Sequence, residues 1–161
     1  SETTAAATGA VGVVRRDPMA MRPFCGYHMG DYFQHWIDMG KKVKNQPKIF
    51  NVNWFRLDDE GHFLWPGFGD NMRVLMWILK RCKGEVDAVE TPIGYLPKAE
   101  DINLEGLDDF SIETLKGILE VDNAKWAKEA EGIEEFYKKF GDKLPAELRA
   151  ELEGLKARVQ A

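Results

Sequence analysis

Long apolar runs and cysteines are both scarce in this chain of 161 residues. No apolar stretch approaches the roughly 20 residues that a helix needs to cross a bilayer, so we expect no membrane partner. The two cysteines, Cys25 and Cys82, form no metal-type spacing. Reduced thiols in a cytoplasmic protein are therefore the expected state of both, since disulfides are rare in reducing compartments.

Positive charge is in deficit as well. The sequence has 22 Lys and Arg residues against 27 Asp and Glu residues, which gives a formal net charge of -5. Binding to nucleic acid depends on clustered cations that neutralise phosphates. Short basic pairs such as Arg15-Arg16 and Lys41-Lys42 do not make such a cluster. We therefore expect no nucleic-acid partner.

Helical spacing of apolar residues is the commonest pattern along the chain. It predicts helices over residues 27–39, 71–81, 111–119, 123–140 and 145–159. Gly40 and Gly141 are placed to end the first and fourth of these helices. Asp70 or Asn71 is placed to cap the second helix. The C-terminal part of the chain is therefore expected to be mostly helical.

Alternating apolar and polar residues predict a hairpin ahead of the second helix. One strand covers residues 48–54 and the returning strand covers residues 62–65, with an acidic turn between them that ends at Gly61. His62 is expected on the surface of this hairpin. Residues 83–106 show no sustained period and are expected to form loops. The expected fold class is α+β, with an aromatic hairpin followed by helices.

Aromatic residues gather in and around this hairpin. Five large aromatic side chains lie there: Trp54, Phe55, Phe63, Trp65 and Phe68. A packed core is one interpretation, because aromatic residues bury well and pair across strands. Phe68 favours a second interpretation, since it lies between two glycines in a loop, where an apolar side chain needs something to cover it.

A nucleobase can provide such a cover. Phe55 and Phe63 lie on opposite limbs of the hairpin, so their rings can meet across it. Aromatic faces that stack on a base contribute about 1–3 kcal/mol per base. Stacking accepts any base, whereas the side chain of Asn71 offers both a donor and an acceptor and can therefore read guanine. Backbone N–H groups of residues 68–71 can supply the remaining contacts.

Two strings of residues in this segment are more specific than the aromatic pattern. They are Asn-Trp-Phe-Arg at residues 53–56 and, after a short acidic turn, Phe-Leu-Trp-Pro-Gly-Phe-Gly-Asp-Asn at residues 63–71. Together they closely resemble the guanine-binding segment of the GTP-dependent phosphoenolpyruvate carboxykinases. The likeness extends to residues 17–24, 26–32 and 91–95 and to the terminal helices. It covers nearly the whole chain, but only the C-terminal portion of a full-length family member.

The resemblance implies a role for each residue that matches the family motif. Phe55, Phe63 and Phe68 are implied to form the base pocket, and the loop of residues 68–71 is implied to contact the nucleotide. The full set of implied nucleotide-binding residues is Trp54, Phe55, Phe63, Phe68, Gly69, Asp70 and Asn71. Residues 15–161 are implied to be the C-terminal part of the nucleotide-binding domain of a larger α/β enzyme.

The resemblance also implies that residues 1–14 form a mobile lid over the substrates. Composition alone favours a disordered tail there, because the residues are small and flexible. The implied lid residues are Thr3, Thr4, Ala5, Ala6, Ala7, Thr8 and Gly9. Arg22 and Phe24 are implied to approach the organic-acid substrate. An ion pair for Arg22 and a core position for Phe24 are equal alternatives.

The family reaction converts oxaloacetate and GTP into phosphoenolpyruvate, carbon dioxide and GDP, a step of gluconeogenesis. It uses Mn2+ or Mg2+, whose ligands are implied to lie outside this chain, as are the catalytic residues. The sequence has no G-x-x-x-x-G-K-S/T phosphate loop, and its opening residues resemble those that follow a cut within a longer protein. The chain alone is therefore expected to be inactive without the remainder of the parent chain. The alternative is a stand-alone, non-enzymatic nucleotide-binding or structural fragment.

Two further groups of residues carry weaker functional hypotheses. His28, Asp31 and His35 share one side of a predicted helix and could ligate a metal, but a structural or solvated role is favoured. Arg56 and Arg73 could hold nucleotide phosphates, although surface salt bridges are the commoner use of such residues.

Overall fold

The structure is a computed structural model, and it describes residues 2–3, 14–15 and 24–161. The chain divides into two compact units. One unit combines residues 1–46 with residues 124–161, and the other is residues 47–123. The second unit is therefore continuous in sequence, whereas the first is assembled from both ends of the chain.

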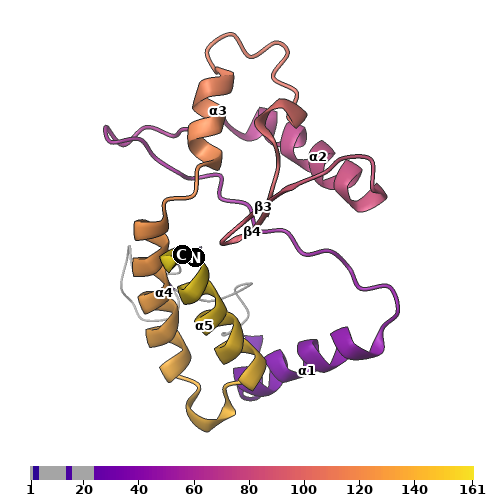
Figure 1. Cartoon of the computed structure of the whole chain (residues 1–161), viewed down its shortest axis with the longest axis vertical. Coiled ribbons are helices and arrows are strands. Elements are labelled where there is room, and N and C mark those ends of the chain that lie inside the picture. The colour runs from indigo at the N-terminus through magenta and orange to yellow at the C-terminus, as the bar shows by residue number, and fades with distance from the viewer. Residues whose placement is uncertain (1, 4–13, 16–23) are drawn as a thin grey trace. The chain divides into compact units, whose positions relative to one another are not determined.

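Three helices dominate the unit that is built from both ends of the chain: α1 (Met29–Lys42), α4 (Asn123–Lys138) and α5 (Ala146–Gln160) (Figure 1). A short 3-10 helix, η5 (Gly141–Lys143), connects α4 to α5. These helices confirm the three predicted helical regions of this unit, with ends that differ by a few residues.

Two predicted helix ends are wrong. Gly40 does not end α1, because it lacks the positive φ with which glycine stops a helix, and the helix continues to Lys42. Lys41 and Lys42 in the last turn suit the negative end of the helix dipole. The other helix, α4, already ends at Lys138, and Gly141, with a φ of 54°, belongs to η5.

Aromatic packing forms the core of this unit. Met29, Phe136 and Phe140 are buried, and Phe33 packs against them. The ring centroids of Phe136 and Phe140 are 5.2 Å apart, and those of Phe33 and Phe140 are 5.6 Å apart. Phe136 in the last turn of α4 and Phe140 just after that helix therefore pack against the residues Met29 and Phe33 of α1.

The start of α1 packs closely against η5. His28 caps the helix, and its Nδ1 atom accepts a hydrogen bond from the Gly30 N–H at 3.0 Å. Asp31 forms an ion pair with Lys143 at 2.6 Å. Gly30 is buried, and a Cβ atom added there would overlap the carbonyl oxygen of Lys143. This close approach therefore depends on glycine at position 30.

The second unit is built around tryptophans. Helices α2 (Asn71–Lys83) and α3 (Ile112–Leu119) supply Trp77 and Leu115 to its core. The buried residues of that core are Trp65, Trp77, Ala99, Ile102, Phe110 and Leu115. Both helices lie where helical spacing predicts them, which is consistent with the mixed helix and strand class.

The predicted aromatic hairpin is wrong in its strands. Residues 48–54 and 62–65 do not form a ladder in the described structure, and the isolated bridge between Leu57 and Phe63 joins the two limbs. Burial nevertheless alternates along residues 48–54. The cause is that one side of this extended segment packs on the core, through the partly buried side chains of Phe50 and Trp54. One-sided burial gives the same alternation with or without a partner strand.

A small antiparallel ladder lies where only loops are predicted. Within residues 83–106, β3 (Val89–Thr91) pairs with β4 (Gly94–Leu96). The Oγ1 of Thr91 donates to the carbonyl oxygen of Gly94 at 2.6 Å, and Gly94 has a φ of 126° that glycine adopts readily. Strands of three residues are too short for alternation to reveal them.

A second ladder lies near the N-terminus. The two-residue strand β1 (Glu2–Thr3) pairs antiparallel with β2 (Val14–Arg15). The two ends of residues 4–13 are therefore held next to each other, which differs from the tail that composition favours. Residues 4–13 themselves lie outside the described part of the chain.

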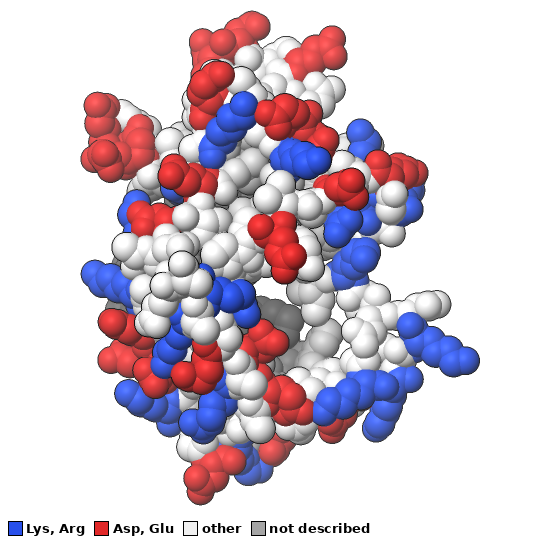
Figure 2. Space-filling view, in the orientation of Figure 1, with Lys and Arg blue, Asp and Glu red and all other residues white. Residues whose placement is uncertain are grey.

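Charged residues of both signs are interspersed over the face shown in Figure 2. Ion pairs include Lys41 with Glu147 at 2.6 Å and Lys156 with Glu134 at 3.4 Å. Surface pairs of this kind contribute about 0–1 kcal/mol each, so apolar packing is the main source of stability in each unit. Each of the described helices is too short or too polar to span a membrane.

Candidate nucleotide-binding site

Three phenylalanines of the aromatic segment are exposed to solvent. The exposed fraction is 72% for Phe55, 64% for Phe63 and 92% for Phe68. Leaving a large apolar side chain exposed forgoes about 1.5–3 kcal/mol that burial would contribute. These three residues therefore lie outside the buried core of their unit. Their exposure favours the alternative in which a ligand covers them.

The positions of the three rings follow from local geometry. The centroids of Phe55 and Phe63 are 6.0 Å apart with their planes at 60°, so the expected meeting of these rings is confirmed. Phe68 begins a short 3-10 helix, η3 (Phe68–Asp70), directly after Gly67. Gly67 has a φ of 133°, a conformation that favours glycine.

Two tryptophans join these phenylalanines to the core of their unit. Trp65 is only 7% exposed, and its ring centroid lies 6.2 Å from that of the half-buried Trp54. The Trp65 ring also contacts Phe110, with centroids 5.5 Å apart. The tryptophans of the segment therefore pack into the core while its phenylalanines are left exposed.

A tight turn connects the two limbs that carry Phe55 and Phe63. The Asp58 N–H donates to the His62 carbonyl oxygen at 2.9 Å. In return, the Asp58 carboxylate accepts hydrogen bonds from the N–H groups of Glu60 at 2.9 Å and His62 at 2.8 Å. The His62 side chain is 72% exposed, which confirms its expected surface position.

The Asp58 carboxylate should make this turn sensitive to acid. Hydrogen bonds from the backbone, that of the His62 N–H above all, lower the pKa of the Asp58 carboxyl below its ordinary value. A depressed folded-state pKa means that Asp58 stabilises the turn above the unfolded-state pKa, and that this contribution is lost as pH falls through the folded-state pKa. In a carbon NMR titration of the complete protein, the Asp58 carboxyl should therefore titrate below an ordinary aspartate.

A matched variant separates the causes of this shift. His62→Ala keeps the backbone N–H that donates to Asp58, so most of the lowering of the pKa should persist in it. A titration midpoint of Asp58 at or above that of an ordinary aspartate in the unsubstituted protein would contradict the prediction.

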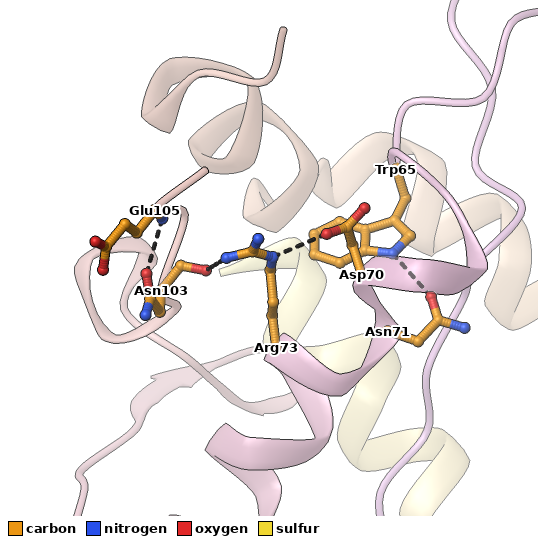
Figure 3. A network of polar contacts seen from close by, with 6 residues as sticks. All are labelled: Trp65, Asp70, Asn71, Arg73, Asn103 and Glu105. Atoms are coloured by element: carbon orange, nitrogen blue, oxygen red, sulfur yellow. Dashed lines mark hydrogen bonds and ion pairs between the residues drawn. The ribbon is translucent and has the colours of Figure 1, made fainter. Parts of the chain in front are cut away.

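Asn71 is the first residue of α2 and follows η3 directly (Figure 3). The Trp65 Nε1–H donates a hydrogen bond to the Asn71 Oδ1 at 2.9 Å. The amide nitrogen of Asn71 lies on the side away from the indole (Figure 3). Asn71 therefore presents a donor outward, whereas the sequence predicts a donor and an acceptor together.

An ion pair fixes the residue before Asn71. The Arg73 Nε donates to Asp70 Oδ1 at 3.0 Å, and its Nη1 donates to the Asn103 carbonyl oxygen at 2.8 Å (Figure 3). Asp70 holds the N-cap position of α2, but its side chain makes no capping hydrogen bond. The prediction of Asp70 as a cap is therefore correct in its position but not in its hydrogen bond. The predicted use of Arg73 in a salt bridge is confirmed.

Arg56 holds the first limb of the turn against α3. Its Nη1 donates to the carbonyl oxygen of Ile118 at 2.6 Å. Ile118 lies in the last turn of α3, where carbonyl groups lack partners within the helix and the dipole favours a cation. Arg56 therefore contacts a backbone carbonyl rather than making the surface ion pair that the sequence favours.

Residues 1–158 match the family model described as "Phosphoenolpyruvate carboxykinase C-terminal P-loop domain". The chain belongs to the GTP-dependent phosphoenolpyruvate carboxykinases. The resemblance of the aromatic segment to this family is thereby confirmed for the chain as a whole.

Several bacterial carboxykinases are similar to this chain over nearly its full length. Proteins named "Phosphoenolpyruvate carboxykinase [GTP]" from Renibacterium salmoninarum and Paenarthrobacter aurescens are each 58% identical over 161 residues. The one from Treponema pallidum (strain Nichols) is 56% identical over 163 residues. Each match covers 99% of this chain but 26% of the relative, so the chain spans about a quarter of the length of these carboxykinases.

Other residues that the carboxykinase resemblance singles out are only partly described. Phe24 is 81% exposed and lies outside the buried core of its unit in this chain. Arg22 lies outside the described residues. Of the implied lid residues, Thr3 is described as part of β1. The others lie outside the described residues: Thr4, Ala5, Ala6, Ala7, Thr8 and Gly9.

The weak metal hypothesis has no support from geometry. His28 caps α1 and Asp31 pairs with Lys143, which are the structural roles favoured for these residues. His35 is exposed. In the part of the carboxykinase chain that the structure describes, no group of three or more His, Cys, Asp or Glu side chains could hold a metal ion.

Two contacts around the candidate site have no counterpart in the sequence predictions. One is the hydrogen bond from Trp65 to Asn71, and the other joins Arg73 to the Asn103 carbonyl oxygen. The spacing of Asp70 and Arg73 by three residues at a helix start is a usable signal for their ion pair. A carbonyl acceptor such as that of Asn103 has no signal, because every residue type carries one.

Proposed function

We propose that the complete protein is an active GTP-dependent phosphoenolpyruvate carboxykinase, which converts oxaloacetate and GTP into phosphoenolpyruvate, carbon dioxide and GDP. One observation carries the proposal: three exposed phenylalanines lie in a chain that is 58% identical to relatives whose name specifies GTP. This chain contributes the recognition of guanine. The remainder of the parent chain contributes the chemistry, since 26% of a relative's length is covered here.

The base would lie among Phe55, Phe63 and Phe68. Stacking contributes about 1–3 kcal/mol per base and would cover rings that are otherwise left in water. Trp54 supports this pocket from the core side, because it is half-buried and packs against Trp65. The pocket is therefore a set of exposed rings on a rigid aromatic base.

Guanine and adenine differ at position 6, where guanine carries an oxygen and adenine an amino group. The outward amide nitrogen of Asn71 is a donor and would bond the guanine O6. The N–H groups of Asp70 and Asn71 already donate to carbonyl oxygens within the turn. We therefore assign the additional contacts to the N–H groups of Phe68 and Gly69.

The proposed reaction has two parts. Loss of carbon dioxide from oxaloacetate leaves an enolate, and the enolate oxygen attacks the γ-phosphorus of GTP with GDP as the leaving group. Mn2+ or Mg2+ supplies charge neutralisation in such reactions, and we assign its ligands to the remainder of the parent chain. Holding the base is the part that this chain plays, because a fixed nucleotide places the γ-phosphate for transfer.

We also propose that residues 1–14 act as a lid over the bound substrates. A lid excludes water, which would protonate the enolate to pyruvate. Support comes from β1 and β2, which bring the two ends of residues 4–13 together. Arg22 and the exposed Phe24 are proposed to lie near the organic acid. Both cysteines are free thiols, which supports a cytoplasmic location for this activity.

Turnover of oxaloacetate by the purified complete protein tests the proposal. With GTP and a divalent cation we expect phosphoenolpyruvate to form, with a kcat/KM about 5- to 150-fold above that with ATP, because the wrong base loses a hydrogen bond. The separate 161-residue chain should show no turnover, since we assign the catalytic residues to the remainder of the parent chain.

Two outcomes would contradict this proposal. Turnover by the 161-residue chain would place the chemistry within it. Nucleotide binding by the complete protein without any turnover would favour the alternative of a non-enzymatic nucleotide-binding protein. Reactions without oxaloacetate serve as the control, because they measure hydrolysis of GTP alone.

A further inference from the structure

We infer that Trp65 determines the choice of guanine over adenine indirectly, by fixing which atom of the Asn71 side-chain amide faces the base. This inference rests on the proposed function and names a residue that the proposal does not use for reading the base. Trp65 is a positioning residue in this scheme. Asn71 makes the contact with the nucleotide.

The Trp65 indole N–H can form its hydrogen bond with only one orientation of the Asn71 side-chain amide. An indole N–H is a donor and never an acceptor, so it pairs with the Asn71 oxygen, 2.9 Å away, and not with the NH2 group. The indole itself is held in place, because Trp65 is 7% exposed and packs between Trp54 at 6.2 Å and Phe110 at 5.5 Å. The direction of its N–H is therefore fixed by the core.

Without this hydrogen bond, the amide would have two nearly equivalent orientations. The oxygen and NH2 group of asparagine are similar in size, and the last side-chain torsion is broad and roughly two-fold. A buried donor left without its acceptor shifts such an equilibrium by about 5- to 150-fold. Trp65 thus keeps the nitrogen outward in nearly all molecules.

The start of α2 provides a fixed pivot for this amide. Arg73 bonds both the Asp70 carboxylate at 3.0 Å and the Asn103 carbonyl oxygen at 2.8 Å, which ties the residue before Asn71 to a distant loop (Figure 3). With the backbone held, rotation of the Asn71 amide is the main freedom left. An outward NH2 group donates a hydrogen bond to guanine O6, whereas an outward oxygen would accept one from the amino group of adenine.

The test compares kcat/KM for GTP, ITP and ATP in variants of the complete enzyme. Trp65→Phe keeps an aromatic ring and removes the N–H. We expect it to lower the ratio of GTP to ATP activity by about 5- to 150-fold, mostly through a gain with ATP, because the amide can then turn over. The kcat/KM for ITP should change in the same way as that for GTP, since hypoxanthine also carries an oxygen at position 6. The Trp65→Phe/Asn71→Ala double variant should have the same ratio as Asn71→Ala.

A packing control separates this effect from simple loss of stability. Leu115→Ala removes a buried side chain of the same core and leaves both ring contacts of Trp65, with Trp54 and with Phe110, in place. It should lower the melting temperature and leave the ratio of GTP to ATP activity unchanged. A merely structural role of Trp65 would make Trp65→Phe behave in the same way, and that result would overturn the inference.

The remaining outcomes distinguish the inference from the function on which it rests. A lower ratio in Asn71→Ala but not in Trp65→Phe overturns the inference and keeps the proposed pocket. An unchanged ratio in both variants also overturns the assignment of Asn71 to guanine O6. If Trp65→Phe does not fold, hydrogen exchange of the Trp65 indole N–H decides, because the inference requires its hydrogen bond to Asn71. Exchange should be slower in the unsubstituted enzyme than in Asn71→Ala, and equal rates overturn the inference.

Discussion

Phe68→Ala in the complete enzyme is expected to raise the KM for GTP about 5- to 150-fold, the equivalent of a lost stacking contact of about 1–3 kcal/mol. The dissociation constant of GDP should rise by a similar factor, because the two nucleotides share the base. The KM for oxaloacetate should not change, since the base pocket does not contact it. Phe68 is 92% exposed, so its truncation removes little packing and the melting temperature should stay the same.

Ile49→Ala is the matched control for this variant. Ile49 is 80% exposed and belongs to the same unit, but it lies outside the aromatic segment. Its truncation should leave the KM for GTP unchanged. An unchanged KM for GTP in Phe68→Ala would place the base elsewhere, and a marked fall in its melting temperature would return Phe68 to a packing role.

Gly30→Ala should produce the largest effect on folding among single-methyl changes in α1. The added Cβ would overlap the carbonyl oxygen of Lys143 and would crowd the Nδ1 atom of His28, which caps the helix. The carbonyl cannot simply move away, because the Leu144 N–H of the same peptide group donates to the Gly141 carbonyl oxygen at 3.3 Å. Overpacking of this kind costs about 1–3 kcal/mol. Amide hydrogen exchange in α1 should therefore be about 5- to 150-fold faster.

Gly40→Ala provides the control within the same helix. A Cβ atom at Gly40 would meet the Gln46 side chain at 3.9 Å, which is ordinary contact. Replacing glycine inside a helix by alanine stabilises it by about 0.5–1 kcal/mol, so exchange in α1 should become slower. Equal rates in the two variants would contradict the close contact between Gly30 and η5.

Local physics explains what could be predicted from the sequence. Each described α-helix lies where apolar residues recur at helical spacing, because that spacing depends only on neighbouring residues. Phe68 was informative for a similar reason. A large apolar side chain between Gly67 and Gly69 has little backbone or side chain nearby to cover it, and the structure leaves it exposed.

Contacts between distant residues explain most of what could not be predicted. Arg56 finds its acceptor 62 residues away, at the end of α3, and Arg73 finds Asn103 30 residues away. Both acceptors are backbone carbonyl groups, which no sequence pattern marks. The prediction of a paired strand over residues 48–54 failed for another reason. Packing against a core and pairing with a strand produce the same alternation of burial.

The division of the chain into a continuous and a discontinuous unit has a consequence for synthesis on the ribosome. Residues 47–123 leave the ribosome as one stretch, so Trp65 and Trp77 can pack before α4 and α5 have been made. Met29 of α1 cannot be buried against Phe136 until α4 has been made, and the ion pair between Asp31 and Lys143 joins residues 112 positions apart. The apolar face of helix α1 therefore stays without these partners until α4 and η5 have been made.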